Sequence, residues 1–367
     1  MGDATKPAER LLPIDQVRGL ALVLMVVDHA SAFLNQGRVM PGSRNLAHGM
    51  TSFPVAQFFL RWATHFCPVA FVFLAGLSLV LATRRRTQRG EPAGAIDRFL
   101  VTRGLFILLL DVAWMNAGGP RSGLHLDVLT AIGCGIAAMA FLRHLAPAWL
   151  AALAAGLVLT PELGDELLPT GLANLLWDGG AATQSIFLNY AVLPWVGVLA
   201  LGWCWGEIVL GPSIDVERLG ERARATLVPL FLGYLALRGL NAFGNARAPR
   251  LDASLQQWLD VSKNPPSLAF LCLETSFLGA CLAGFSRLSA RGDRFPVLLT
   301  FGRTALFFYV IHFQVLHAAA ALTGTGKSLG IPGTLLGACL LLLVMYPLCR
   351  WYERWAAGHD NLVTRYL

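Results

Sequence analysis

The chain has 367 residues, of which 55% are hydrophobic and 14% are charged, and its mean hydropathy is +0.57. A soluble globular domain carries about 25% charged residues, so this composition excludes an ordinary soluble protein and indicates membrane helices. The formal net charge of +7 comes mostly from arginines that concentrate in alternate loops. Membrane topology explains that pattern better than nucleic-acid binding, and we expect a lipid bilayer and no nucleic acid as partner.

Apolar stretches predict an all-α, polytopic integral membrane protein with about ten transmembrane helices. We treat residues 1–367 as a single transmembrane domain with a short cytoplasmic N-terminal segment, residues 1–13. The predicted spans are residues 16–35, 62–83, 99–117, 124–142, 146–162, 188–210, 224–241, 267–287, 296–322 and 333–351.

The loop after the second span predicts the orientation of the chain. It is rich in arginine and is therefore expected to be cytoplasmic by the positive-inside rule. The loop from Pro161 to Ser185 has acidic residues and no lysine or arginine, as an external loop can. With ten spans, this orientation places both termini in the cytoplasm.

Several known chemistries lack their sequence motifs in this chain. The cysteines lie in or beside apolar stretches without paired spacing, so neither a disulfide framework nor a thiolate metal site is supported. The zinc protease, serine hydrolase and nucleotide-binding loop motifs are also missing from the sequence. No local spacing argues for a histidine metal site, and we expect no metal.

Arg18 and His29 lie eleven positions apart in the first predicted span. If the span is helical, this separation is about three turns, so both side chains point the same way, roughly 16 Å apart along the axis. Ionisable residues are costly in a bilayer and indicate function. Arg18 suits an anionic ligand or an interfacial anchor, and His29 suits proton transfer. A carboxylate beside it, Asp28, would orient the imidazole and stabilise its protonated form.

His65 lies near the start of the second predicted span and shares a helix face with Arg61. Pro68 is expected to kink this helix and direct His65 toward a cavity. The alternative is an interfacial histidine held near Trp62.

His312 in the ninth predicted span is a second candidate for the reaction centre and shares a face with Tyr309. Arg303, nine residues earlier, is expected to point away from it. Asp111 and Glu274 are carboxylates inside other spans, for which structural hydrogen bonds between helices are the favoured interpretation.

Five segments together resemble bacterial proteins that carry the heparan-alpha-glucosaminide N-acetyltransferase catalytic domain. They are residues 13–20, 24–29, 59–76, 193–199 and 308–312, and the segment around Phe66-Cys67-Pro68 is the most specific. The pair Arg18-x10-His29 is similar to the motif of the acyltransferase type 3 family, whose members are polytopic enzymes that modify glycans.

The resemblance implies a membrane acetyltransferase in the bacterial inner membrane. Acetyl-CoA from the cytosol would be the acyl donor, and an amine or hydroxyl of a sugar or glycan would be the acceptor. In the heparan enzyme the active histidine lies in the first non-cytoplasmic loop, before the Phe-Pro that starts the second span. The corresponding region here contains His48, so the role stays open among His29, His48 and His65.

Acyl transfer across the bilayer assigns roles to two sets of residues. His29 would act as a general base or carry the acetyl group transiently, with Asp28, His65 and His312 as further candidate catalytic residues. Basic residues would bind the CoA phosphates. These are Arg18, Arg84, Arg85, Arg86 and Arg103.

Two other classes of function stay open at this point. A proton-coupled transporter or flippase would use a relay of buried groups, and a membrane scaffold would use none. The relay would consist of Asp28, His29, Asp111, Glu274 and His312. The sequence leaves the oligomeric state open, including a homodimer.

Overall fold

A computed structural model of the chain describes residues 11–39, 53–117, 123–163, 169–210, 215–246, 248–292 and 294–359. His48 and nearly all of the predicted N-terminal segment lie outside these residues.

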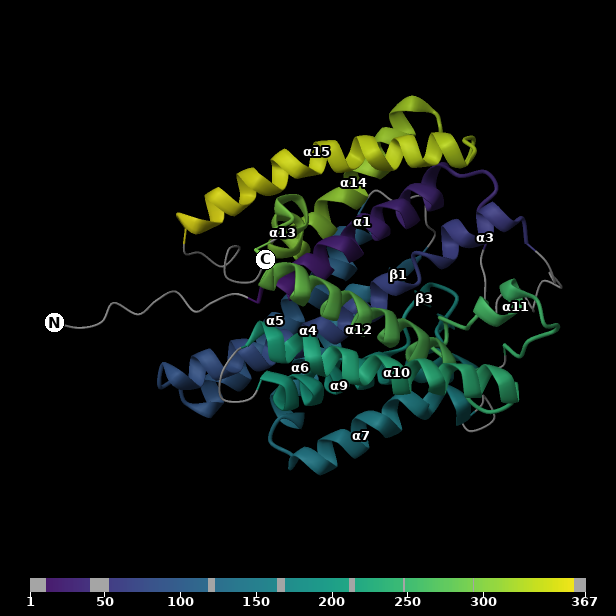
Figure 1. Ribbon diagram of the computed structural model, residues 1–367. Coiled ribbons are helices and arrows are strands. Elements are labelled where there is room, and N and C mark those ends of the chain that lie inside the picture. Colours follow the sequence, from purple (N-terminus) through teal and green to yellow (C-terminus); the bar gives the residue numbers. More distant parts are fainter. Residues whose placement is uncertain are drawn as a thin grey trace.

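The described chain is mostly helical, with three short strands (Figure 1). The first helices are α1 (Leu12–Leu34), α3 (Val55–Trp62), α4 (Phe66–Gln88), α5 (Ala93–Leu109), α6 (Val128–Leu142), α7 (Pro147–Leu159) and α8 (Thr170–Ala173). The later helices are α9 (Val192–Leu210), α10 (Val216–Leu240), α11 (Leu255–Leu259), α12 (Leu268–Ala290), α13 (Pro296–Arg303), α14 (Ala305–Thr323) and α15 (Ile331–Ala357). The strands are β1 (Leu124–Leu126), β2 (Gly180–Ala181) and β3 (Ile186–Leu188).

Seven helical segments in the described chain are long and apolar enough to cross a membrane. They are α1, α3 together with α4, α9, α10, α12, α14 and α15. The apolar segments α6 and α7 are shorter, and α5 has 17 residues before it continues into a π-helical turn at Leu110–Met115. The protein is therefore a multi-pass membrane protein, and each predicted span overlaps a helix.

Three short strands depart from the all-α expectation. Strand β3 pairs in parallel with β1 and antiparallel with β2. The predicted spans 124–142 and 188–210 therefore begin as strands, and their helices start only at Val128 and Val192. The Asp111 carboxylate accepts hydrogen bonds from the backbone N–H groups of Asp127 and Thr130, which fixes the start of α6.

Two predicted helices are interrupted. The second span breaks at Ala63–His65, and Pro68 lies in the first turn of α4, where a proline leaves no helical hydrogen bond unmade. The predicted kink is therefore present, but a few residues before the proline. The ninth span breaks at Thr304, whose hydroxyl donates to the carbonyl of Thr300 and ends α13 before α14 begins.

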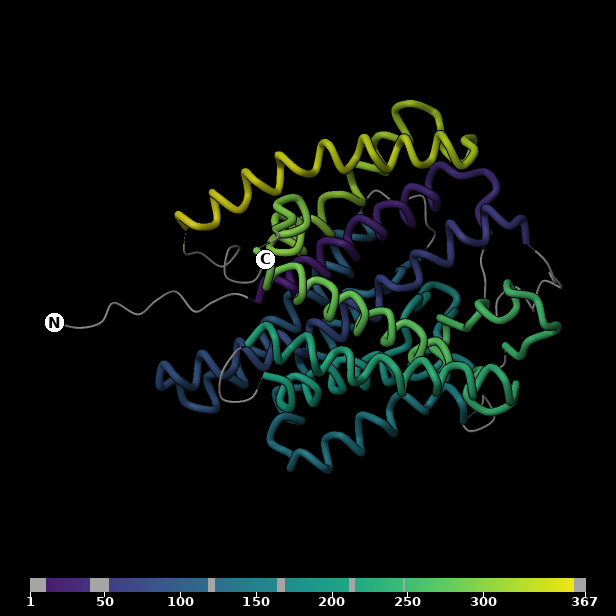
Figure 2. The backbone as a smooth tube through the Cα atoms, viewed as in Figure 1, coloured from purple at the N-terminus to yellow at the C-terminus, as the bar shows by residue number. Residues whose placement is uncertain are grey.

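Helix α1 lies inside the bundle and contacts α4, α12, α13, α14 and α15 (Figures 1 and 2). Around it, α10 packs along α12, α4 along α9, and α5 along α6. Helix α1 begins and α15 ends at the same end of the bundle. At the opposite end, Asn35 after α1 pairs with Leu329 before α15.

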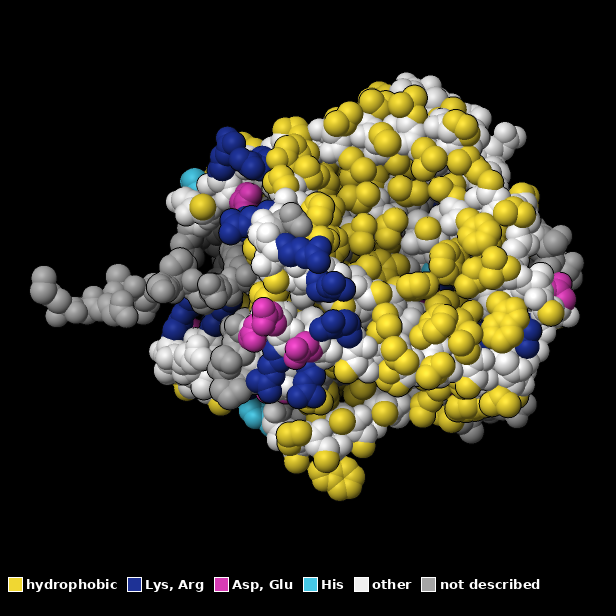
Figure 3. Space-filling model, viewed as in Figure 1, with side chains coloured by type: hydrophobic (Ala, Val, Ile, Leu, Met, Phe, Trp, Pro, Cys, Tyr) yellow, Lys and Arg dark blue, Asp and Glu magenta, His cyan; other side chains and the backbone are white. Residues whose placement is uncertain are grey.

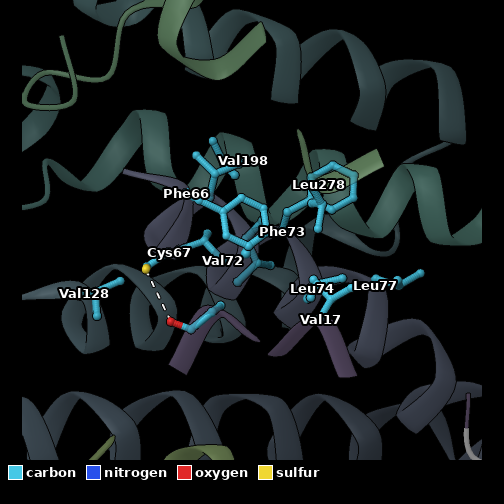
Figure 4. Packing of buried hydrophobic residues seen from close by; sticks show 14 of the residues in the cluster. Val17, Phe66, Cys67, Val72, Phe73, Leu74, Leu77, Val128, Val198 and Leu278 are labelled. Carbon is cyan, nitrogen blue, oxygen red and sulfur yellow. Dashed lines mark hydrogen bonds between the residues drawn. The ribbon is translucent and has the colours of Figure 1, made fainter. Parts of the chain in front are cut away.

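Apolar packing joins these helices around α4 (Figure 4). Phe73, Leu74 and Leu77 of α4 belong to the same buried cluster as Val17 of α1 and Val198 of α9. The outer surface is also apolar, because a broad band of hydrophobic side chains crosses the visible face (Figure 3). Lysine and arginine side chains gather toward the end of the bundle where α15 ends.

Two glycines allow α1 and α13 to cross closely. A Cβ atom on Gly19 would lie 2.1 Å from the carbonyl oxygen of Leu298, and one on Gly302 would lie 1.8 Å from that of Asp15. Small residues at such crossings let membrane helices approach each other. Each glycine adjoins an arginine, so the crossing brings Arg18 and Arg303 to the same part of the bundle.

Candidate functional site

Two adjoining cavities lie inside the helical bundle. The larger, here called the arginine chamber, has a volume of about 310 Å³ and is lined by Arg18, Arg103, Arg303 and mostly apolar side chains. The smaller, here called the histidine chamber, has a volume of about 70 Å³. Its polar lining consists of Asp28, His29, Thr64, Cys67, Asp127, Tyr190, Lys263 and Tyr309. Phe71, Val128 and Tyr309 line both chambers and therefore form the boundary between them.

Helix α1 supplies the central residue of each chamber. It is helical without interruption from Leu12 to Leu34, so Arg18 and His29 lie on one face, about three turns apart. Arg18 contributes to the arginine chamber and His29 to the histidine chamber. The predicted layout of one cation and one imidazole along a single face is therefore present.

The Arg18 side chain is held by three groups. It forms an ion pair with Asp15 at 3.3 Å and donates hydrogen bonds to the carbonyl of Leu74 and to the hydroxyl of Ser78. About a fifth of the side chain (22%) stays exposed. The guanidinium is thus fixed in place and still accessible from the chamber.

His29 and His312 form a hydrogen-bonded pair. The Nδ1 atom of His29 lies 2.8 Å from Nε2 of His312, and the two rings are stacked at 5.0 Å. On its other side, Nδ1 of His312 lies 2.9 Å from the carbonyl oxygen of Phe308. A carbonyl only accepts hydrogen bonds, so when His312 is neutral its proton is on Nδ1 and its Nε2 accepts from His29. This assigned network leaves Nε2 of neutral His29 with a free lone pair.

The carboxylate of Asp28 makes its hydrogen bonds with arginines. Its Oδ1 atom lies 2.6 Å from the guanidinium of Arg61 and 3.0 Å from that of Arg38, which also donates to the Asp28 carbonyl. The orienting contact predicted between Asp28 and His29 is thus made by His312. Asp28 still lines the histidine chamber and places a negative charge beside the imidazole.

His65 lies in the turn between α3 and α4 and is not among the residues that line the histidine chamber. It is almost fully buried, its ring meets the edge of Phe270, and its Nδ1 atom has no hydrogen-bond partner within the described chain. Around the break in the helix, Thr64 and Cys67 line the chamber, whereas His65 does not.

The five arginines predicted to bind CoA phosphates lie in different places. Arg18 and Arg103 line the arginine chamber, whereas Arg84, Arg85 and Arg86 do not. Arg84 pairs with Glu207 at 2.5 Å, and Arg86 pairs with Glu91 at 2.6 Å.

Arg303 is an additional arginine in this chamber. Its guanidinium lies 3.3 Å from Glu353 and 4.0 Å from Asp15, and about 29% of the side chain is exposed. The sequence did not suggest that Arg303 lines this chamber, because the ninth predicted span was expected to be one continuous helix. The break at Thr304 and the crossing with α1 bring Arg303 beside the chamber.

Lys263 is a second residue that sequence reasoning missed. It follows α11 and is buried with 9% of its surface exposed, and its ammonium lies 5.3 Å from the ring centre of Tyr190. Burial, together with the smaller effect of the Arg61 charge, lowers the pKa of the Lys263 ammonium to about 8, and the Asp28 carboxylate opposes the change.

The small sheet positions two more chamber residues. Asp127 directly follows β1, and Tyr190 comes two residues after β3. The Asn189 amide donates to the Asp127 carboxylate at 2.5 Å, and its backbone N–H donates to the carbonyl of Leu126. Pairing of β1 with β3 therefore brings two distant segments together beside His29.

Asp111 and Glu274 lie outside both chamber linings. Asp111 is fully buried and also accepts a hydrogen bond from the hydroxyl of Thr130 at 2.6 Å, which is the structural bond between helices that was expected. In the described chain, Oε1 of Glu274 has no hydrogen-bond partner. No group of three or more metal-ligating side chains is arranged for a metal ion among the described residues.

Comparison with known proteins identifies the family. The family described as "Heparan-alpha-glucosaminide N-acetyltransferase, catalytic" matches residues 10–237, which is more than half of the chain. Comparison with curated proteins gave no match. The matched part includes Arg18, His29 and Arg103, whereas Lys263, Arg303 and His312 lie beyond it. The chain therefore belongs to the heparan-alpha-glucosaminide N-acetyltransferase catalytic family, and this membership implies a membrane acetyltransferase.

Proposed function

We propose that the protein transfers an acetyl group from acetyl-CoA in the arginine chamber to an acceptor whose attacking nitrogen or oxygen reaches into the histidine chamber. The observation that carries this proposal is the shared boundary of Phe71, Val128 and Tyr309. One side of the boundary has the cations that an anionic donor needs, and the other has an imidazole with a free lone pair. A donor and an acceptor entering from opposite sides would meet beside His29.

The arginine chamber suits CoA in both charge and shape. Guanidinium groups bind phosphate through strong charge-assisted hydrogen bonds, and Arg18, Arg103 and Arg303 all line this cavity. Its apolar residues, among them Leu22 and Ile132, suit the less polar pantetheine arm. The volume of about 310 Å³ is at the lower end of ligand sites, which fits an arm better than a whole nucleotide.

His29 acts as the general base in this proposal. The acceptor nitrogen or oxygen attacks the carbonyl carbon of the thioester and gives its proton to Nε2 of His29. The carbon–sulfur bond then breaks, and the departing CoA sulfur takes the proton back from His29. His312 keeps Nε2 of His29 unprotonated before the attack, and Asp28 stabilises the imidazolium that forms.

We place the arginine chamber on the cytoplasmic side and both termini in the cytoplasm. The gathering of basic side chains at one end of the visible face supports this orientation by the positive-inside rule (Figure 3). A bacterial inner membrane would then supply cytosolic acetyl-CoA on one side and a sugar or glycan with a free amine or hydroxyl on the other. A topology reporter fused after Arg89 is expected to be cytoplasmic, and one fused near Asp178 external.

The hydrogen bonds of the buried ionisable groups support a proton-coupled transporter less well. His29 and His312 are hydrogen-bonded to each other, but Asp28 pairs with arginines and Asp111 binds the start of α6. Within the described chain, these bonds do not join the buried ionisable groups into one relay.

The direct test is turnover by the purified protein. Detergent-solubilised protein is incubated with acetyl-CoA and a panel of amino sugars and short glycans, and both CoA release and acetylated product are measured. We expect product with at least one acceptor and a Kd for acetyl-CoA below millimolar. A Kd above millimolar together with no CoA release across the panel would contradict the proposal.

A further inference from the structure

Lys263 lines the histidine chamber but has no part in the reaction described so far. It lies in a tight turn between α11 and α12, where Lys263 pairs with Pro266 and the Ser262 hydroxyl donates to the carbonyl of Pro265 at 2.8 Å. The N–H of Ser267 donates to the carbonyl of Ser262 at 2.9 Å, and the Ser267 hydroxyl caps α12. Hydrogen bonds on both sides thus fix the turn, and the Lys263 side chain lines the histidine chamber.

A buried arginine fixes the segment that leads into this turn. Arg238 at the end of α10 is 1% exposed, and its guanidinium donates to the carbonyls of Gln257, Trp258 and Asp260. These carbonyls belong to α11 and the residue that follows it. The position of Lys263 is therefore set before any ligand binds, as preorganised electrostatic stabilisation requires.

Among the described residues, no carboxylate lies within hydrogen-bond distance of the Lys263 ammonium. Asp28, a nearby carboxylate, already pairs with Arg38 and Arg61. Within the described chain, the ammonium lies over the Tyr190 ring, and the ammonium donates no hydrogen bond. A buried charge without a paired anion is costly, so the site favours a ligand that brings negative charge.

The size of the chamber restricts what that negative charge can be. A volume of about 70 Å³ accommodates an acetyl group and one attacking atom, whereas ligand sites usually begin at about 300 Å³. A sugar ring with its own acidic group does not fit beside the acetyl group. The anion that arises within the chamber is the oxygen of the acetyl carbonyl during transfer.

We propose that Lys263 is a catalytic residue that stabilises the oxyanion of the tetrahedral intermediate. As the acceptor atom bonds to the carbonyl carbon, the π electron pair moves onto the carbonyl oxygen beside the Lys263 ammonium, and the acceptor proton goes to His29. When the intermediate collapses, the carbonyl reforms and the carbon–sulfur bond breaks. The inference rests on the proposed acetyl transfer and adds one residue to it.

The pH dependence of turnover follows from the protonation of Lys263. Only the ammonium stabilises an oxyanion, and the pKa of about 8 means that it loses its proton as the pH rises through 8. We therefore expect turnover to decline above about pH 8. Charged or titratable groups from every neighbouring element act on this lysine or line the same chamber. They are Asp28, His29, Arg38, Arg61, His65, Cys67, Asp127, Tyr190, Glu274 and Tyr309.

The test compares Lys263→Met with Lys263→Arg, and Lys327→Met serves as the control because Lys327 is an exposed lysine. The acceptor is the member of the panel that the wild type acetylates fastest. Loss of one oxyanion contact typically lowers kcat by about 10²–10³, so we expect that loss in Lys263→Met, with both KM values within about threefold of wild type. The kcat of Lys263→Arg should be at least about tenfold higher than that of Lys263→Met. The decline of its turnover at alkaline pH should begin above pH 8.

Thermal unfolding separates this role from a structural one. Removing a buried ammonium should leave the Tm of Lys263→Met at or above that of the wild type. A kcat within about threefold of wild type, or an increase confined to the acceptor KM, would overturn the inference. If His29→Ala is inactive while Lys263→Met is normal, the proposed transferase stands and the oxyanion role is wrong. If the wild type releases no CoA, both the proposed acetyl transfer and the oxyanion role of Lys263 are wrong.

Discussion

The arginine chamber and the histidine chamber share a wall but differ in size and in the origin of their residues. The arginine chamber is about four times larger, and much of its lining is apolar. Two of its cations adjoin the closely packed glycines of α1 and α13. The histidine chamber is small and polar, and it combines α1, the turn before α4, the ends of two strands and the loop before α12. This difference suggests that donor binding and chemistry can be disrupted separately.

The largest expected effect is on the histidine side. His29→Ala should lower kcat by about 10²–10⁴, because it removes the proposed general base, while the Kd for acetyl-CoA stays within about threefold of wild type. His317→Ala is the control, since His317 lines neither chamber. CoA release and isothermal titration measure the two quantities.

Two results would contradict this assignment. Wild-type turnover in His29→Ala, together with inactivity of His65→Ala or His48→Ala, would move the active histidine toward the segment before α4. An acetylated histidine trapped during turnover and found by mass spectrometry would replace direct transfer with a covalent route.

The next effect is on the arginine side. Arg18→Ala should weaken acetyl-CoA binding by about 2–5 kcal/mol, because the proposed charge-assisted contact of this partly buried guanidinium with a CoA phosphate would be lost. Arg84→Ala is the matched control, because Arg84 pairs with Glu207 away from this chamber. Titration calorimetry gives both affinities, and gel filtration in detergent checks folding. Equal losses in the two variants would show that the donor binds outside the arginine chamber.

His312 allows a finer test of the histidine pair. His312→Phe leaves the Nδ1–H of His29 without an acceptor, which typically costs about 1–3 kcal/mol and should lower kcat accordingly. His312→Gln keeps an acceptor oxygen and should recover part of the loss. The pH–rate profile is the readout, because a positioning residue also shifts the acidic limb that His29 controls. A normal profile in His312→Phe would exclude the positioning role.

The smallest expected effect is on the crossing that brings Arg18 and Arg303 together. In Gly302→Ala the added Cβ atom would meet the Asp15 carbonyl at 1.8 Å, so we expect a loss of about 1–3 kcal/mol in the free energy of unfolding and weaker acetyl-CoA binding. Gly284→Ala is the control, because its Cβ atom would have no neighbour within 4 Å. Denaturant titration measures the free energy of unfolding of both variants. Equal values for Gly302→Ala and Gly284→Ala would argue against a close crossing of α1 and α13.

Local sequence reasoning succeeded where one helix fixes the geometry. The shared face of Arg18 and His29 follows from helical periodicity along an uninterrupted α1, and the same argument holds for Tyr309 and His312 on α14. The helical, membrane-embedded character followed from composition for a similar reason, since every long apolar stretch must satisfy its own backbone in the bilayer.

Residues from distant segments could not be found in this way. Lys263 lines the same chamber as His29 because Arg238 and the turn before α12 hold its loop, and no local pattern predicts that. Arg303 required knowledge of the break at Thr304 and of the crossing with α1. The carboxylate partners of Arg84 and Arg86, which are Glu207 and Glu91, could not be identified from the sequence either.

The measurement that tests the central claim most directly is the structure of the protein with acetyl-CoA bound. The account predicts the phosphates beside Arg18, Arg103 and Arg303, and the thioester at the boundary formed by Phe71, Val128 and Tyr309. Its carbonyl carbon should lie roughly 3–4 Å from the place where an acceptor atom would contact Nε2 of His29. A donor bound beside Arg84 and Arg86, or a thioester directed away from His29, would contradict the account.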